Sequence, residues 1–203
     1  MGIFLSKSQG SARPSIKIVL LGPENAGKTS LLARLSNVQP GGDSPAPTIG
    51  FNLAELSISR RKALVFDVGG GASALWPNYV KDADLVVFLI DAADEKQFAK
   101  IKAEMKKLST IISKNATVIF ALNKIDTGKA ILSQEFIEQF EIEKIFANDL
   151  FLHRVSALKG TGVPQLVEKI SAVVNAPRLI VDKENRPKLP AKTPAKPAKI
   201  RRF

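Results

Sequence analysis

The 203-residue sequence contains no cysteine, which excludes disulfide bonds, thiolate metal sites, palmitoylation and prenylation. It has no run of about 18 apolar residues, so we expect no transmembrane helix. The apolar part of residues 1–11 is too short for a secretory signal peptide. The single histidine, His153, has no nucleophile or metal-ligand pattern around it, and we expect it to be structural. These absences predict one soluble, cytosolic domain.

Negative charge is scarce at one end of the chain. The net charge is +11, and residues 178–203 carry nine Lys or Arg against two acidic residues. Prolines recur too often there for a helix, and apolar residues are too few for a core. We therefore expect residues 177–203 to be an extended, disordered basic tail. Its charge suits a solvated extension, an anionic membrane surface or an acidic partner; nucleic acid has no support beyond charge.

Short apolar runs alternate with segments of helical periodicity along residues 16–176, which we interpret as one domain after an N-terminal segment, residues 1–15. Strands that alternate with helices predict an α/β fold with a mostly parallel sheet and helices on both faces. A hairpin should turn at Ser59–Lys62. The expected strands are Ile16–Leu21, Asn52–Ile58, Ala63–Phe66, Leu85–Asp91, Thr117–Leu122 and Phe151–Val155.

Four helices are expected between these strands. The first is Lys28–Leu35, and a Pro- and Gly-rich mobile loop, Gln39–Pro47, should follow it. Asp94 and Ser133 should cap the second and third helices, and Pro164 should lie in the first turn of the last. The expected inward-facing residues are Phe98, Ile101, Met105, Leu108 and Ile112, then Phe136, Ile137 and Phe140, and finally Leu166, Val167, Ile170 and Val174.

The first chemical motif, Gly22–Thr29, fits the phosphate-binding pattern G-x-x-x-x-G-K-[ST] between a strand and a helix. Gly22 and Gly27 allow the backbone to turn so that successive N–H groups face an anion. Lys28 should reach the β- and γ-phosphates, and the Thr29 hydroxyl should bind magnesium. The loop and the helix start also assign Glu24, Asn25, Ala26 and Ser30 to the nucleotide site.

The second motif, Asp67-Val68-Gly69-Gly70, follows an apolar run that ends at Phe66. Asp67 is suited to hold magnesium through water. The paired glycines allow a backbone N–H, assigned to Gly70, to reach the γ-phosphate. A change at that phosphate can then order or release the loop that follows, which is how a hydrolysable ligand becomes a switch.

The third motif, Asn123-Lys124-Ile125-Asp126, accounts for the choice of base. The Asp126 carboxylate can accept hydrogen bonds from the N1–H and 2-amino group of guanine but meets mismatched groups on adenine. Lys124 can lay its apolar stem over the base. A backbone N–H after the last strand can bond to the guanine oxygen, from the segment Ser156, Ala157 and Leu158. The predicted ligand is therefore GTP or GDP, not ATP.

Together these motifs resemble those of the ADP-ribosylation-factor (Arf and Arf-like) family of small GTPases over Met1–Asn175. The most specific stretch, Pro47–Asn52, is similar to the family's first switch. The resemblance implies a P-loop small GTPase fold, Mg²⁺ as cofactor, and Thr48 in the magnesium shell of the GTP form. It also implies a hairpin, Asn52–Phe66, that slides on nucleotide exchange. Effectors of the family read aromatic residues around this hairpin, which here are Phe51, Phe66, Trp76 and Tyr79. As large aromatics, all four are also candidates for the core, and the resemblance favours partner contact mainly for Phe51 and Tyr79.

The sequence departs from the family pattern at Gly71, where relatives carry the glutamine that orients the attacking water. Glycine has no group that can position water, and only Ser73 among the next residues offers a polar side chain. We expect weak intrinsic GTP hydrolysis, and recognition by the usual exchange factors and activating proteins is in doubt. A scaffold that never cycles is the alternative, and membership of the family's ciliary branch stays open.

Membrane attachment is expected from the N-terminus. Met1–Ser6 fits the N-myristoylation pattern with Gly2 as acceptor, and this modification is usual among Arf relatives. One myristoyl chain binds membranes only marginally, so the basic tail or Lys7, Arg13 and Lys17 would supply a second signal. The resemblance thus predicts a monomeric, peripherally membrane-associated switch in vesicle trafficking, with GTP-dependent effectors, an exchange factor and an activating protein as partners.

Overall fold

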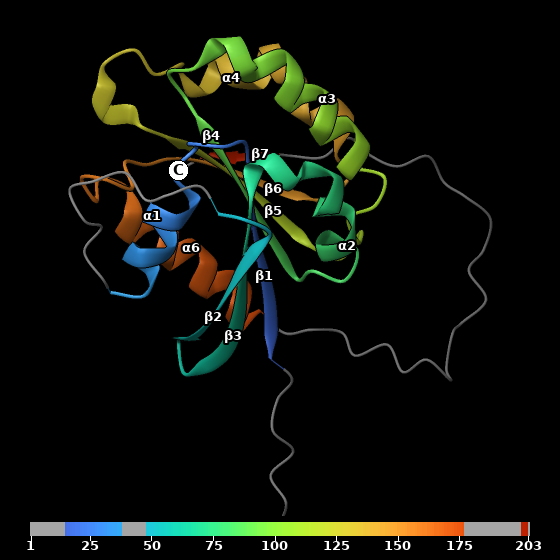
Figure 1. Ribbon diagram of the computed structural model, residues 1–203, viewed down its shortest axis with the longest axis vertical. Helices are drawn as coiled ribbons and strands as arrows, with labels where there is room; N and C mark the ends of the chain where they lie inside the picture. Colours follow the sequence, from blue (N-terminus) through green and yellow to red (C-terminus); the bar gives the residue numbers. More distant parts are fainter. Residues whose placement is uncertain (1–14, 38–47, 177–199, 203) are drawn as a thin grey trace, which may run out of the picture.

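The computed structural model describes residues 15–37, 48–176 and 200–202. A twisted sheet lies between two layers of helices (Figure 1). The predicted α/β fold, with a mostly parallel sheet and helices on both faces, is confirmed. Three predictions lie outside the described residues: the lipid acceptor Gly2, the loop that ends at Pro47, and residues 177–199 of the tail.

The sheet of the described residues has seven strands in the order β2-β3-β1-β4-β5-β6-β7. Only β2 and β3 pair in antiparallel fashion; all other neighbours are parallel. The strands are β1 (Ile16–Leu21), β2 (Phe51–Ile58), β3 (Arg61–Val68), β4 (Leu85–Asp91), β5 (Thr117–Asn123), β6 (Asp149–Arg154) and β7 (Ile200–Arg202).

Helices cover both faces of this sheet. The α-helices are α1 (Lys28–Leu35), α2 (Trp76–Val80), α3 (Phe98–Leu108), α4 (Ser133–Phe140), α5 (Ile142–Ile145) and α6 (Val163–Asn175). Short 3₁₀ helices are η1 (Gly70–Leu75), η2 (Glu95–Gln97) and η3 (Ile125–Thr127). Figure 1 shows α1 and α6 on one side of the sheet and α2, α3 and α4 on the other. No helix in these described segments is long and apolar enough to cross a membrane.

Two hydrophobic clusters form the core, one on each face of the sheet. Phe88 and Phe120 belong to the cluster under α2, α3 and α4, whereas Leu89 and Ile119 belong to the cluster under α1 and α6. Neighbouring residues of β4 and β5 therefore alternate between the two cores, as strand geometry requires. Strands β4 and β5 are buried almost throughout, which explains their continuous apolar runs and holds their ends rigidly in place.

The β2–β3 hairpin is longer than predicted because its turn is tighter. Only Ser59 and Arg60 form the turn, with φ angles of 51° and 63°. Two consecutive residues in this region match the type I′ turn, whose twist suits paired strands. The ladder then runs from Ile58↔Arg61 to Phe51↔Val68, and it brings the start of β2 beside the second chemical motif.

Three local predictions about helices are wrong. Asp94 precedes η2 rather than α3, and Ser133 is the first residue of α4, so neither side chain caps an α-helix. Val167 is 36% exposed. The buried residues of α6 are Val163, Leu166, Ile170 and Val174. Their spacing defines one stripe, and Val167 lies about 100° around the helix from Leu166, beyond the stripe.

The tail prediction also fails at one point, because Ile200–Arg202 form strand β7. This strand pairs in parallel with β6, with Leu150 opposite Ile200. Without β7, the outer edge of β6 would present unpaired backbone groups, which sheets tend to cover. Composition predicted an extended chain here but could not identify which residues pair.

Candidate functional site

The three chemical motifs converge at the carboxyl ends of the parallel strands. The phosphate loop follows β1, Asp67 lies near the end of β3, and Asn123 ends β5. Side-chain hydrogen bonds join them: Asn123 reaches the phosphate loop at Ala26, and Thr29 reaches Asp67. Open α/β sheets bind ligands at this edge, so the structure brings the sequence-predicted residues into one site.

The phosphate loop is built on backbone conformations that side chains disfavour. Gly22 has φ of 144°, and a Cβ there would lie 2.0 Å from the carbonyl oxygen of Leu89. Asn25 and Gly27 also have positive φ angles, 58° and 92°. Positive φ angles at Asn25 and Gly27, on either side of Ala26, are the kind of backbone geometry from which anion-binding nests are built. Helix α1 begins immediately after it, at Lys28.

Lys28 lies at the centre of this loop. Its ammonium group donates to the carbonyl oxygens of Gly22 and Pro23, both at 2.8 Å. Burial lowers the pKa of Lys28, while the nearby carboxylates of Asp67 and Glu24 act in the opposite direction. Carbonyl oxygens do not neutralise the charge of a buried ammonium group. An anionic ligand in the loop would therefore stabilise the charged form of Lys28.

Three side-chain oxygens meet beside the loop. The Thr29 hydroxyl lies 3.2 Å from that of Thr48 and donates to Asp67 Oδ2 at 2.9 Å. The other carboxylate oxygen, Asp67 Oδ1, is buried and has no hydrogen-bond partner. Hydroxyl and carboxylate oxygens are the ligands that Mg²⁺ takes, usually together with water and substrate phosphates. The orphaned oxygen is thus an observation that fits an ion or its water shell.

The glycines after Asp67 lie against the phosphate loop and the residues before β2. The Gly69 N–H donates to the Gly50 carbonyl at 2.8 Å. A Cβ on Gly70 would lie 2.1 Å from the backbone nitrogen of Glu24, and one on Gly69 would lie 2.4 Å from the Thr48 carbonyl oxygen. Only glycine permits these approaches, so the two expected switch segments and the phosphate loop are in direct contact.

Asn123 joins the phosphate loop to the loop after β6. Its Nδ2 donates to the Ala26 carbonyl at 2.7 Å, and its Oδ1 accepts from the Ala157 N–H at 2.9 Å. The side chain is buried, and its two hydrogen bonds connect the phosphate loop to the loop after β6. Sequence reasoning placed Asn123 in the site but did not identify this bracing function.

The other residues that the sequence assigns to the base lie in the loops after β5 and β6. Lys124, at φ of 63°, pairs with Asp91 at 2.8 Å. The Asp126 carboxylate is exposed, and so is Leu158, while Ser156 and Ala157 are buried. The site thus has a fixed backbone and a free carboxylate that can accept hydrogen bonds from a ligand.

Two residues of this region were missed by sequence reasoning. Asp91, at the end of β4, holds Lys124. Arg34 of α1 donates from Nε to the Ala157 carbonyl at 3.0 Å and from its guanidinium to the Leu158 carbonyl. Asp91 ends an apolar run as Asp67 does, which is a signal that could have been used. Nothing in the sequence marks Arg34, because its partner is a backbone distant in the chain.

The four predicted effector residues divide into two groups. The rings of Phe51, Phe66 and Tyr79 pack against one another with centroids 5.3–6.0 Å apart, and Phe51 is 46% exposed. Trp76 is only 3% exposed. Its ring packs on Phe88, and its Nε1 donates to the Gly69 carbonyl. The expectation that Trp76 contacts a partner is therefore contradicted in this conformation, because its indole is part of the core.

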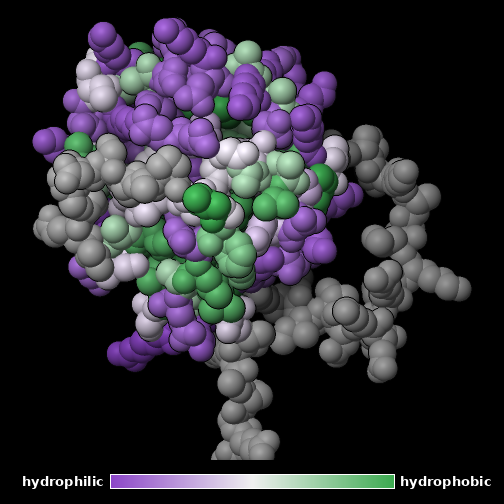
Figure 2. All heavy atoms as spheres, viewed as in Figure 1, coloured by the Kyte–Doolittle hydropathy of each residue, from purple (hydrophilic) through white to green (hydrophobic). Residues whose placement is uncertain are grey.

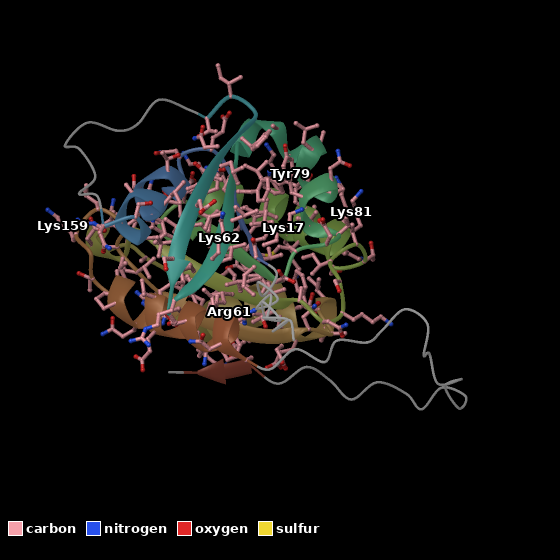
Figure 3. All side chains as sticks on the ribbon, turned by 90° about the horizontal axis from the view of Figure 1, so that it is seen from below. Lys17, Arg61, Lys62, Tyr79, Lys81 and Lys159 are labelled. Carbon is pink, nitrogen blue, oxygen red and sulfur yellow. The ribbon has the colours of Figure 1, made fainter. Side chains whose placement is uncertain are left out.

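An apolar surface surrounds the exposed aromatic group. Figure 2 shows hydrophobic side chains gathered over β2 and β3; the exposed ones include Ile49, Phe51 and Leu53. Seen from below in Figure 3, Tyr79 lies toward one end of the hairpin, and Arg61 lies at its turn.

His153 lies elsewhere, with Nε2 bonded to the Gly162 carbonyl at 2.8 Å, in agreement with the structural function expected for it.

The fold is that of a small GTPase, and the three chemical motifs lie in loops at the carboxyl edge of its sheet. Residues 3–174 match the model of the ADP-ribosylation factor family, so the chain belongs to the Arf family. It is similar to "ADP-ribosylation factor-like protein 2" of Dictyostelium discoideum, with 29% identity over 75% of this chain and 84% of the relative. "ADP-ribosylation factor F" of the same organism is also 29% identical, over 73% and 80%.

A solved structure shows the same fold. It is the Arl6 BBS3 small GTPase from Trypanosoma brucei with the bound nucleotide analogue GppNp. The TM-score is 0.67 at 22% identity, and the match covers 78% of this chain and 98% of that one. At this identity the likeness establishes the arrangement of strands and helices.

Proposed function

We propose that this Arf-family chain is a guanine-nucleotide switch that recruits effectors at a membrane surface and hydrolyses GTP slowly by itself. The observation that carries the proposal is the meeting of three oxygens, from Thr29, Thr48 and Asp67, beside the buried ammonium of Lys28. These groups come from three separate segments. A ligand that combines phosphate with a divalent cation would neutralise the Lys28 ammonium and give the unpartnered Asp67 oxygen a partner. Its phosphate oxygens would accept hydrogen bonds from the N–H groups of the loop.

Guanine selectivity follows from the base side of the site. Asn123 fixes the loop at Ala157, and Lys124 is held by Asp91. The exposed Asp126 carboxylate can then accept two hydrogen bonds from the guanine edge, while adenine presents groups that leave it unpaired. A site built around such a polar pair discriminates by about 10⁴-fold or more.

Magnesium fits the residues present. Thr29 and Thr48 would be its direct protein ligands, and Asp67 would act through water. When bound, the ion neutralises charge that develops on the β- and γ-phosphate oxygens. Thr29 and Asp67 already share a hydrogen bond, so this part of the site is organised before a ligand arrives.

Switching would work through the contact between the two glycine-containing segments. The Gly69 N–H donates to the Gly50 carbonyl, and Gly70 packs against the backbone of the phosphate loop. A γ-phosphate would hold both Thr48 and the Gly70 amide; its loss would release them. The exposed aromatic surface on β2 lies directly after Gly50, so its position would report which nucleotide is bound.

Hydrolysis would be slow because Gly71 stands where relatives carry the water-orienting glutamine. Gly71 is the second residue of η1, directly after Gly70, and contributes no polar side chain. Membrane attachment would come from myristate on Gly2, with basic residues as the second signal. Liposome flotation that survives Gly2→Ala, or that ignores anionic lipid, would contradict this arrangement.

The test of the proposal uses Trp76, the single tryptophan. Because its indole donates to Gly69, its fluorescence should change when GppNp replaces GDP in the presence of magnesium. ATP should not displace the guanine nucleotides. A chain that binds guanine nucleotides with no fluorescence change would be the non-cycling scaffold, and a chain that binds neither would overturn the proposal.

A further inference from the structure

The side chain of Glu24 occupies the place where a side chain on Gly71 would begin. An ideal Cβ on Gly71 would lie 2.3 Å from Glu24 Oε1 and 3.3 Å from its Cδ. Glu24 is an exposed residue of the phosphate loop, and Gly71 is exposed as well. The missing side chain has therefore not left an empty volume, because a carboxylate from another segment fills it.

This carboxylate lies at the phosphate end of the site. The Glu24 backbone is in van der Waals contact with Gly70, whose N–H we assign to the γ-phosphate. Burial lowers the pKa of Lys28, and the Glu24 charge, together with that of Asp67, is close enough to oppose part of this lowering. Glu24 and Gly71 also line a small cavity of about 80 Å³ that continues between Trp76 and Lys100. Since one water needs about 10–15 Å³ of such volume, the cavity can hold water.

We propose that Glu24 orients the attacking water for GTP hydrolysis, a function that Gly71 cannot perform. The inference rests on the proposed function. The water oxygen forms a bond to the γ-phosphorus while the bond from phosphorus to the β–γ bridging oxygen breaks. The electron pair of that bond leaves with GDP. The water proton passes through the Glu24 carboxylate to the departing inorganic phosphate, so GTP and water give GDP and phosphate.

The chemistry of a carboxylate also accounts for slow turnover. An ionised Glu can accept a hydrogen bond from water but cannot donate one to the phosphate. A glutamine amide does both and adds no negative charge beside the γ-phosphate. Glu24 would therefore supply part of the positioning that glutamine supplies in relatives, and the remaining charge repulsion would keep the rate low.

The test is single-turnover hydrolysis of preloaded GTP with magnesium. Glu24→Ala should lower the rate by about tenfold or more, although removal of the negative charge beside the γ-phosphate should slow rather than speed the dissociation of GppNp. Glu104→Ala is the matched control, because Glu104 lines the same cavity from α3. This variant should hydrolyse GTP at the native rate. Equal rates for Glu24→Ala and the native chain, or an equal loss in both variants, would overturn the inference.

A second variant moves Glu24 without altering it. The methyl group of Gly71→Ala would overlap the carboxylate and displace it, yet it offers no polar group. Gly71→Ala should therefore be as slow as Glu24→Ala, and the double variant no slower than either. A native rate for Gly71→Ala would contradict the inference.

Failure of the inference and of the proposed function are distinguishable. A chain that does not load guanine nucleotide overturns both. A chain that loads GTP and responds through Trp76, but whose hydrolysis ignores Glu24, overturns this inference alone. Loading of GTP with no hydrolysis above that of free GTP would do the same.

Discussion

The nucleotide cradle and the switch face of this protein are built in opposite ways. The cradle consists of the phosphate loop with its bracing residue Asn123, which joins Ala26 to Ala157 through buried hydrogen bonds. The switch face, formed by residues 48–50, β2 and η1, presents exposed apolar residues such as Ile49 and Phe51. Buried, mutually satisfied polar groups rigidify a site. Exposed apolar surface with glycine hinges is what a region needs when it must change shape and meet partners.

The largest expected effect is at the centre of the cradle. Lys28→Met removes a buried cation that we expect to meet the β- and γ-phosphates, and it should weaken GTP binding by about a hundredfold or more. Competition with a fluorescent GDP measures this. Lys62→Met, which removes a surface cation paired with Glu55, should leave the affinity unchanged. Retained affinity in Lys28→Met would show that the cradle does not hold phosphate.

A change of base preference should follow from Asp126→Asn. The amide cannot accept both guanine donors, so GTP affinity should fall by about a hundredfold. Xanthine, which has a carbonyl in place of the 2-amino group, should gain because the amide can donate to it. If the variant binds GTP as the native chain does, the exposed carboxylate does not read the base.

The brace is tested by Asn123→Ala. This change leaves the Ala157 N–H and the Ala26 carbonyl without partners, and the free energy of unfolding should fall by about 2 kcal/mol. Urea unfolding monitored by circular dichroism measures the loss. Asn115→Ala, at an exposed turn, should cost less than about 0.5 kcal/mol. Equal stability of the two variants would mean that the cradle is not rigidly braced.

The smallest effect on stability is expected on the switch face. Phe51→Ala removes ring contacts with Phe66 and Tyr79 and should cost about 1 kcal/mol, with GTP affinity unchanged. A loss above about 3 kcal/mol would be typical of a core residue instead, and it would remove the contrast between the two regions.

The sequence predicted the cradle better than the switch face. Residue type and spacing place Gly22, Lys28 and Asn123 in one site, since strand ends converge wherever a parallel sheet forms. Periodicity cannot reveal contacts between segments that are distant in the sequence. Examples are the contact of Glu24 with Gly71 and the hydrogen bond from Arg34 to the Ala157 carbonyl. Trp76 illustrates the same limit, because its place in the aromatic core depends on how α2 packs on β4.

The hairpin and the tail were predicted in part. Alternation located β2 and β3, but the two positive φ angles at the turn, which fix their register, are not encoded by Ser59 and Arg60 as clearly as they would be by glycine. Strand β7 could not be predicted, because three residues in a basic tail carry too little apolar pattern. Its pairing with β6 is a property of the sheet edge rather than of the tail sequence.

The effect of Gly71 on catalysis is tested most directly by single-turnover hydrolysis of preloaded GTP, comparing the native chain with Gly71→Gln. The glutamine would need to displace only the flexible end of Glu24, so the variant should fold and load as the native chain does. We expect slow native turnover and an acceleration of about tenfold or more by the amide. Native turnover as fast as that of the variant would contradict this expectation, because Gly71 would then not limit the reaction.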